Sequence, residues 1–293
     1  MRKFPLYTLL HSLLWIALVV GSAFAFADDT LTLDQVVARH LDSIGTANVR
    51  AAVKTRSSMG KFTFDIIQGG VLQANGDAGL ISSGRMMKVM LRTTSPKYAG
   101  ERFWYDGKKV NIPTTDVAAR TYLGDFLYRN DTILRDGLFG GTISTAWPLL
   151  DLSSRGAKLA YEGVKAIDGK KLLVISYQPK KSASELQIKL FFEPDTYRHV
   201  MTQYRFEVAP YMNVSPGQKN DRTGVTNLRS PTIYTVVEKF SEFSTVDGIT
   251  SPNLWELSYS VEPVSVVMMQ WKIPIVRTTI NPDVDLKVIF PQD

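Results

Sequence analysis

Apolar and polar residues alternate along most of this chain with a period of two, which is typical of β-strands with one buried face. The first such run begins near Ser57, where Phe62, Phe64 and Ile66 are separated by polar residues. Because Asp-Gly pairs at 106–107, 168–169 and 247–248 predict tight hairpin turns, we expect a long antiparallel meander. Its strands are predicted at 57–66, 72–82, 87–92, 102–105, 110–112, 157–166, 170–178, 185–193, 197–208, 233–243 and 253–261, with a last apolar stretch at 264–276.

The first helix is predicted to begin after residue 32. Thr32 and Gln35 have the spacing of a capping box, in which each side chain bonds the backbone N–H of the other residue. Apolar residues from Val36 to Ile44 then fall on one helical face. Gly45 is expected to end this helix in a left-handed conformation, and a shorter helix is expected from Thr46.

The middle of the chain breaks the strand pattern. Residues 117–150 have apolar positions at helical spacing, interrupted by Gly137, Gly140 and Gly141. This pattern predicts two or three short helices joined by glycine hinges, inserted between two halves of the meander. We therefore expect a mainly β fold with helices (α+β). Its strongly curved antiparallel sheet forms an open half-barrel, which the N-terminal helix and central lid helices cover on the concave face.

Residues 1–27 have the composition of a secretory signal peptide. Arg2 and Lys3 precede an apolar run, and small residues ending at Ala27 form an A-x-A cleavage site. An uncleaved N-terminal anchor is the alternative interpretation. After cleavage, residues 28–293 are expected to form a single domain. A long mobile loop is predicted near residues 210–231, which are polar and rich in Gly, Pro, Asn and Ser.

Composition narrows the location and the class of partner. A hydrophobic content of 44% and a charged content of 21% are typical of a globular chain with a core. The chain has no Cys, which excludes both the lipid-anchor Cys of an exported bacterial lipoprotein and the disulfides usual in secreted eukaryotic domains. We therefore expect a periplasmic protein. The net charge of +6 is dispersed, with no basic run long enough to bind nucleic acid.

Candidate catalytic residues are scarce. Outside the signal peptide the chain has His40, predicted to pack at the edge of the core, and His199, predicted to lie on the surface. These two histidines form no metal site of recognisable spacing, and no nucleophile-elbow, phosphate-loop or zinc-protease motif occurs. We therefore expect no enzymatic activity, no catalytic residue, no metal and no cofactor.

Several segments, in their order along the chain, resemble the LolA-like family of outer-membrane lipoprotein carrier and sorting proteins. They are a strand, basic turn and strand at 76–91, an Asp-Gly-Lys hairpin with aromatic flanks at 103–110, a strand pair at 237–252 and a closing segment at 281–291. The resemblance implies a half-open β-barrel lidded by helices, which binds acyl chains. It also implies that Arg85, at the position of the family's basic turn, contacts the lid.

An apolar trough beneath the lid is the expected binding site. An acyl chain gains about 0.8 kcal/mol per buried methylene, so such a trough can bind lipid without polar contacts. The side chains expected to face it, from the early sheet, the lid and the later sheet, are Met87, Val89, Leu91, Phe103, Tyr105, Leu138, Phe139, Leu186, Ile188, Leu190 and Phe192.

The leading hypothesis is a periplasmic carrier of lipids or lipoprotein acyl chains, acting in outer-membrane lipoprotein sorting or lipid transport. Its expected partners are a lipid or an acylated lipoprotein, together with a transport partner in the inner or outer membrane. Two alternatives stay open. One is an envelope-stress sensor or regulator with the same fold, which acts through protein contacts, and the other, ranked last, is a cell-envelope enzyme.

Overall fold

The computed structural model describes residues 31–115, 119–181, 185–209, 231–263 and 267–291. The predicted signal peptide and nearly all of the predicted loop at 210–231 lie outside these residues.

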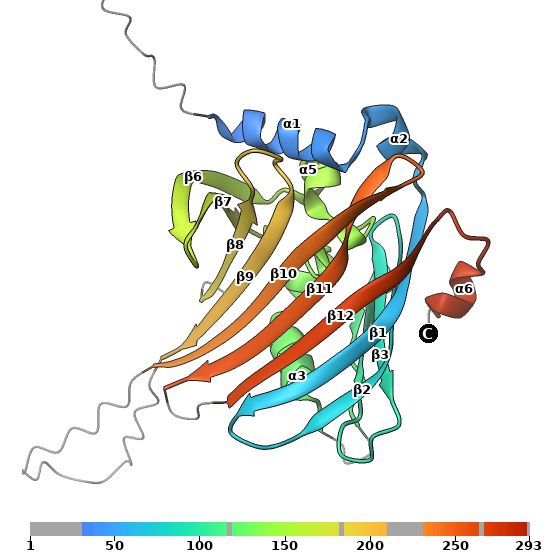
Figure 1. Cartoon of the computed structure of the whole chain (residues 1–293), viewed down its shortest axis with the longest axis vertical. Helices are drawn as coiled ribbons and strands as arrows, with labels where there is room; N and C mark the ends of the chain where they lie inside the picture. Colours follow the sequence, from blue (N-terminus) through green and yellow to red (C-terminus); the bar gives the residue numbers. More distant parts are fainter. Residues whose placement is uncertain (1–30, 116–118, 182–184, 210–230, 264–266, 292–293) are drawn as a thin grey trace, which may run out of the picture. The chain divides into compact units, whose positions relative to one another are not determined.

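Twelve strands form one antiparallel sheet (Figure 1). The two strands at its ends do not pair with each other within the described residues, so the sheet stays open. The expected mainly β fold with an open antiparallel sheet is therefore confirmed. The strands are β1 (Thr55–Gln68), β2 (Gln73–Ser83), β3 (Met86–Thr93), β4 (Glu101–Tyr105), β5 (Val110–Asn111), β6 (Lys158–Ile167), β7 (Lys170–Gln178), β8 (Leu186–Phe192), β9 (His199–Val208), β10 (Thr232–Val246), β11 (Ile249–Glu262) and β12 (Val267–Ile280).

The order of strands across the sheet is β5-β4-β3-β2-β1-β12-β11-β10-β9-β8-β7-β6. Each half of the sheet is a run of sequential hairpins, and the pairing of β1 with β12 joins the halves. In that pair Thr63 lies opposite Lys272 and Phe64 lies opposite Trp271. The join between the halves is therefore made by the first and last strands of the meander, which lie far apart in the sequence.

Short helices complete the fold, and the predicted central helices are present. Figure 1 shows the central helices on one side of the sheet, behind the strands in that view. No helix in the described part of the chain combines the length and apolar character needed to cross a membrane. The helices are α1 (Leu33–Ile44), α2 (Ala47–Ala52), α3 (Tyr122–Arg129), α4 (Thr132–Arg135), α5 (Leu152–Arg155) and α6 (Leu286–Ile289), with 3-10 turns η1 (Gly141–Ile143) and η2 (Pro148–Asp151).

The capping box that begins α1 is confirmed, but the predicted conformation of Gly45 is wrong. The Thr32 hydroxyl accepts from the Gln35 N–H at 3.2 Å, and Gln35 Oε1 accepts from the Thr32 N–H at 2.8 Å. Gly45 has φ 155° and ψ 170°, which is not the left-handed helical conformation. A Cβ at Gly45 would lie 2.5 Å from the carbonyl oxygen of Gly248. Glycine is needed here for close backbone approach to the β10–β11 turn.

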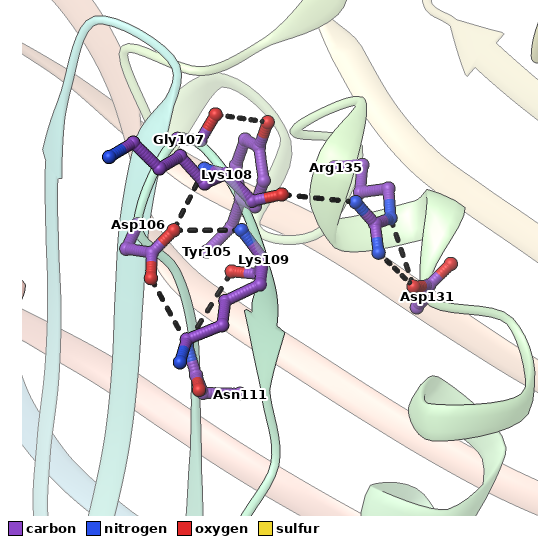
Figure 2. Close-up of polar contacts among 8 residues, drawn as sticks. All are labelled: Tyr105, Asp106, Gly107, Lys108, Lys109, Asn111, Asp131 and Arg135. Atoms are coloured by element: carbon purple, nitrogen blue, oxygen red, sulfur yellow. Dashed lines mark hydrogen bonds and ion pairs between the residues drawn. The ribbon is translucent and has the colours of Figure 1, made fainter. Parts of the chain in front are cut away.

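Two of the three predicted two-residue turns are confirmed, and the turn at 106–107 is corrected. Residues 168–169 and 247–248 each join adjacent strands, with positive φ at both positions. The β4–β5 connection instead spans residues 106–109. Figure 2 shows why: one carboxylate oxygen of Asp106 accepts from the N–H groups of Lys108 and Lys109, each at 2.8 Å.

The same connection holds a central helix against the edge of the sheet. Arg135 of α4 bonds Asp131 through two nitrogens, at 2.9 and 2.6 Å. A third nitrogen of Arg135 donates to the carbonyl oxygen of Lys108 at 3.3 Å (Figure 2). The β4–β5 connection therefore positions α4 as well as ending the early meander.

Buried polar side chains of the sheet bind the backbone of residues 137–147, here called the central segment. Glu238 Oε1 accepts from the Gly140 N–H at 2.7 Å, and the Ser82 hydroxyl accepts from the Thr145 N–H at 2.9 Å. Arg56 donates to the carbonyl oxygen of Thr142. These contacts supply hydrogen bonds that a mostly non-helical buried backbone cannot make with itself.

The two histidines lie together beneath the central segment. His40 is fully buried, as predicted, and its Nε2 accepts from Trp147 Nε1 at 2.9 Å. His199 was predicted to lie on the surface, and this is wrong, since the side chain is 1% exposed. Its ring lies 4.4 Å from Trp147 and 4.9 Å from Phe240. The start of β9 is covered by η1, which the local sequence does not reveal.

We expect the substitution Phe139→Ala to lower the free energy of unfolding by about 3–5 kcal/mol. Phe139 is fully buried, and its ring lies 5.1 Å from Phe103 and 5.4 Å from Trp255, so it ties the central segment to both halves of the sheet. The measurement is urea unfolding of the purified protein. The control is Val276→Ala on β12, where the side chain is 76% exposed and a loss below about 0.5 kcal/mol is expected. Equal losses in the two variants would contradict the packing described.

Candidate ligand-binding cavity

The largest of the described cavities lies where β1 ends and β12 and α3 begin. Its volume is about 590 Å³. Phe64 and Ile66 of β1 and Met269 and Trp271 of β12 form apolar walls, and Tyr98 from the β3–β4 connection contributes a third side. We call this space the apolar cavity. It falls within the range of about 300–1,000 Å³ that is usual for small-molecule sites.

The walls follow from strand alternation and aromatic packing. Residues two apart on a strand share a face, so Phe64 and Ile66 point the same way, as do Met269 and Trp271. The ring of Phe64 stacks on Tyr98 with centroids 4.2 Å apart. Trp271 Nε1 donates to the Tyr98 hydroxyl at 2.7 Å. The stacking and this hydrogen bond therefore fix Tyr98 against the two strands.

One buried acid lies at the polar end of this cavity. Glu101 is 3% exposed and accepts from the Tyr98 hydroxyl at 2.9 Å and from the Thr121 hydroxyl at 2.6 Å. Burial raises the pKa of Glu101 to about 7, although both hydroxyl donors act to lower it. Thr121 is also the N-cap of α3, where its hydroxyl accepts from the Gly124 N–H at 2.9 Å. Glu101 therefore ties the start of α3 to β4.

A second cavity of about 360 Å³ adjoins the first; we call it the polar cavity. The two cavities share Ala99, Glu101, Thr115 and Thr121 in their linings. The remaining lining of the polar cavity comes mainly from the end of β3, the start of β4 and residues 112–115.

Charged side chains in the two linings are mostly basic. Arg92 and Arg102 line the polar cavity, and Lys97 and Arg120 line the apolar cavity. Among the described residues of both linings, Glu101 is the acidic member. Arg120 is held in place, because its Nε donates to the Ile112 carbonyl at 3.0 Å.

The ligand contacts predicted from the sequence are gathered in the core. All of them belong to one buried cluster, which also contains Ile143, Ala146 and Trp147 of the central segment. Leu91 lines the polar cavity, and none of the predicted residues lines the apolar cavity. Their contact with a ligand stays a prediction. In this structure the space beneath the central segment is occupied by side chains, and the larger free volume lies at the end of the sheet.

Arg85 lies exposed in the β2–β3 turn. Its side chain makes no hydrogen bond or ion pair with the described residues. Burial raises the pKa of Asp136, and the charge of Arg85 is a smaller influence that acts to lower it. The hydrogen bonds from arginine to the central segment come from Arg56 and from Arg155, which donates to the Ala146 carbonyl at 2.9 Å. The predicted lid contact of Arg85 therefore stays a prediction.

Sequence reasoning missed Glu101, Tyr98 and Trp271. A signal for Glu101 existed, because it precedes Phe103 by two residues in a strand and so occupies the buried face. An acid on such a face marks a site where another element must supply donors. For Tyr98 and Trp271 the sequence held no such signal, since Tyr98 lies in a mostly polar connection after Lys97 and Trp271 is one of several large apolar residues in its strand.

No model of a known protein family and no curated protein matches the sequence. Similar solved structures include a LolA superfamily protein from Nitrosomonas europaea, at 11% identity and TM-score 0.46, covering 89% of this chain and 98% of that one. A DUF1329 family protein from Desulfovibrio piger has 11% identity and TM-score 0.42, covering 89% of this chain and 98% of that one. A domain assigned to outer membrane lipoprotein sorting, from Vibrio parahaemolyticus, has 10% identity and TM-score 0.37, covering 87% and 97%.

The buried acid predicts a pH dependence of stability. The pKa of Glu101 is raised to about 7 from 4.5, so the folded protein retains this proton at a pH where the unfolded chain has lost it. The free energy of unfolding therefore falls as the pH rises from about 4.5 through about 7. We expect Glu101→Gln, which removes the titration, to reduce by several degrees the loss of melting temperature between about pH 5 and pH 8.

The control for this measurement is Asp168→Asn. Asp168 is an exposed carboxylate whose pKa is lowered by its hydrogen bond with Lys239, so it stays ionised across the same range. Melting curves of the three proteins at several pH values test the expectation. A pH slope for Glu101→Gln as steep as that of the unaltered protein would contradict it.

Proposed function

We propose that this protein is a non-catalytic carrier that binds the acyl chains of lipids or lipoproteins in the apolar cavity. The role fits outer-membrane lipoprotein sorting or lipid transport in the periplasm. The observation that carries the proposal is the cavity of about 590 Å³ with walls of Phe64, Ile66, Met269 and Trp271. Such apolar walls favour the binding of hydrocarbon.

The energetics suit reversible carriage. Each buried methylene contributes about 0.8 kcal/mol, so a partly inserted chain reaches useful affinity without covalent chemistry. The stacked Phe64 and Tyr98 rings and the Trp271–Tyr98 hydrogen bond keep the walls in place before a ligand arrives. A preorganised wall avoids the ordering of side chains that weakens binding.

Two sequence features support the periplasmic setting. Residues 1–27 have the features of a signal peptide with cleavage after Ala27. The chain has no Cys, so it does not depend on disulfide formation after export. The expected partners are a lipid or an acylated lipoprotein and a transport partner in either membrane.

The residues predicted from the sequence have a place in this proposal. Phe139, Phe103 and Leu190 are buried in the same core cluster. To contact them, an acyl chain would have to displace the central segment, which Glu238 and Arg56 hold by hydrogen bonds.

Filling the cavity tests the proposal. We expect Leu72→Trp, which adds a large side chain to the lining, to weaken binding of a fluorescent fatty acid about tenfold or more. A loss of this size corresponds to about two methylenes displaced from the cavity. The control is Val276→Trp, which adds the same side chain at an exposed position of β12. Equal binding by both variants would place the ligand elsewhere.

Lipid mass spectrometry of the protein purified from cells gives an independent measurement. Co-purified lipid in stoichiometric amount is the expected result. Purified protein that carries no lipid and also fails to bind the fluorescent fatty acid would contradict the proposed function.

A further inference from the structure

The turn between β1 and β2 presents apolar side chains to solvent; we call residues 67–71 the hairpin tip. Ile67 is the extra residue of a bulge in the pairing of β1 with β12, and its side chain is 54% exposed. Val71 is 99% exposed. Residues 66–76 include no charged residue. Large apolar side chains that gather on the surface in this way mark a site of contact with a protein or a membrane.

The hairpin tip adjoins the apolar cavity. Ile66 and Leu72 flank the tip, and the Ile66 N–H donates to the Leu72 carbonyl at 3.0 Å, which closes the turn at its base. Both of these residues line the apolar cavity. Tyr122, the first residue of α3, lines the same cavity and is 55% exposed. A tyrosine with an apolar ring and a wet hydroxyl suits the boundary between water and lipid.

Two basic side chains belong to the same lining, and we call them the basic rim. Lys97 is exposed, and its ammonium group makes no hydrogen bond or ion pair within the described residues. Arg120 donates through Nε to the Ile112 carbonyl, and its guanidinium group lies 3.7 Å from the centroid of the Tyr128 ring. The acid of this lining, Glu101, is only 3% exposed. The charge that the lining presents to solvent is therefore positive.

Acidic residues near the tip do not cancel this charge. Asp77 of β2 is paired with Lys61, and Asp125 of α3 is paired with Arg129 at 2.8 Å. Asp65 precedes Ile66 on β1, so its side chain leaves the sheet on the face opposite the apolar cavity. The exposed cations of the rim therefore remain available to an anionic partner.

The composition of this surface favours a bilayer over a protein partner. Its apolar part consists of two aliphatic side chains and one tyrosine ring, whereas a stable protein interface takes about 20–30 residues a side. Binding to a membrane surface instead combines a small inserted apolar area with the attraction of basic residues to anionic headgroups. An uncharged tip beside a basic rim has both of these elements.

We propose that the hairpin tip and the basic rim dock this protein on an anionic lipid bilayer. Ile67 and Val71 insert below the headgroups, Tyr122 lies at headgroup depth, and Lys97 and Arg120 contact lipid phosphates. Docking brings the apolar cavity to the bilayer, because the residues that flank the tip line that cavity. The inference does not depend on the proposed function, since the tip binds a bilayer whether or not the cavity holds an acyl chain.

Flotation of the purified protein with vesicles tests the docking surface. The vesicles are made of phosphatidylcholine with or without phosphatidylglycerol, and we expect tighter binding to those that contain the anionic lipid. Ile67→Ser combined with Val71→Ser should weaken binding about tenfold or more, because it removes the inserted apolar area. The control combines Val164→Ser with Val276→Ser, at positions 53% and 76% exposed on β6 and β12, and should bind as the unaltered protein does.

A charge variant tests the basic rim. Lys97→Gln should weaken binding to vesicles with phosphatidylglycerol about fivefold, and should change binding to pure phosphatidylcholine little. The control is Lys158→Gln, which removes the same charge from an exposed position of β6 and should change neither.

The outcomes separate docking from acyl binding. Absence of binding to either kind of vesicle, or equal losses in the two serine pairs, would show that the docking proposal is wrong. A dimer in sedimentation that the tip variant abolishes, without vesicle binding, would assign the tip to a second copy of the chain and overturn the proposal as well. Without vesicles, the tip variant should bind the fluorescent fatty acid normally, since neither substituted residue lines the cavity. Failure of the unaltered protein to bind that fatty acid would count against the proposed function and leave docking intact.

Discussion

The structure depends on covering the apolar inner face of an open sheet with a segment that is mostly non-helical. Such a segment cannot satisfy its own backbone groups, and it is shielded from water where it lies on the sheet. The sheet supplies what is missing: Glu238 accepts from the Gly140 N–H, and Arg56 donates to the Thr142 carbonyl. The glycine-rich segment is therefore held by single polar residues set among apolar ones on the inner face.

The same arrangement recurs at the other end of the sheet, with a different result. Glu101 on β4 binds Thr121, which caps α3, and so holds that helix at the sheet. Around Glu238 the side chains fill the interior, with Tyr204 and Trp255 completing its hydrogen bonds. Glu101 instead lines both the apolar and the polar cavity. Burial raises the pKa of Glu101 to about 7 and of Glu238 to about 8.

Local patterns predicted local structure well where the cause was local. The Thr32 capping box involves atoms three residues apart, and the 168–169 and 247–248 turns need only positive φ at two adjacent residues. Prediction failed where a distant group intervened. His199 is buried because η1 covers it, and Gly45 adopts its conformation because the β10–β11 turn approaches it. At 106–109 the failure was local, since the Asp106 carboxylate bonds two N–H groups and lengthens the connection.

By itself the sequence determined the strands, the helices inserted among them and, on most strands, the residues that face inward. These follow from periodicity, because each strand must send alternate residues to one face. Which inward residues enclose free volume was decided only by the tertiary structure. Leu190 and Phe139 face the same interior as Phe64 and Trp271, yet only the second pair lines the apolar cavity. Free volume depends on how closely elements distant in the chain approach one another, and that distance is not encoded in any single strand.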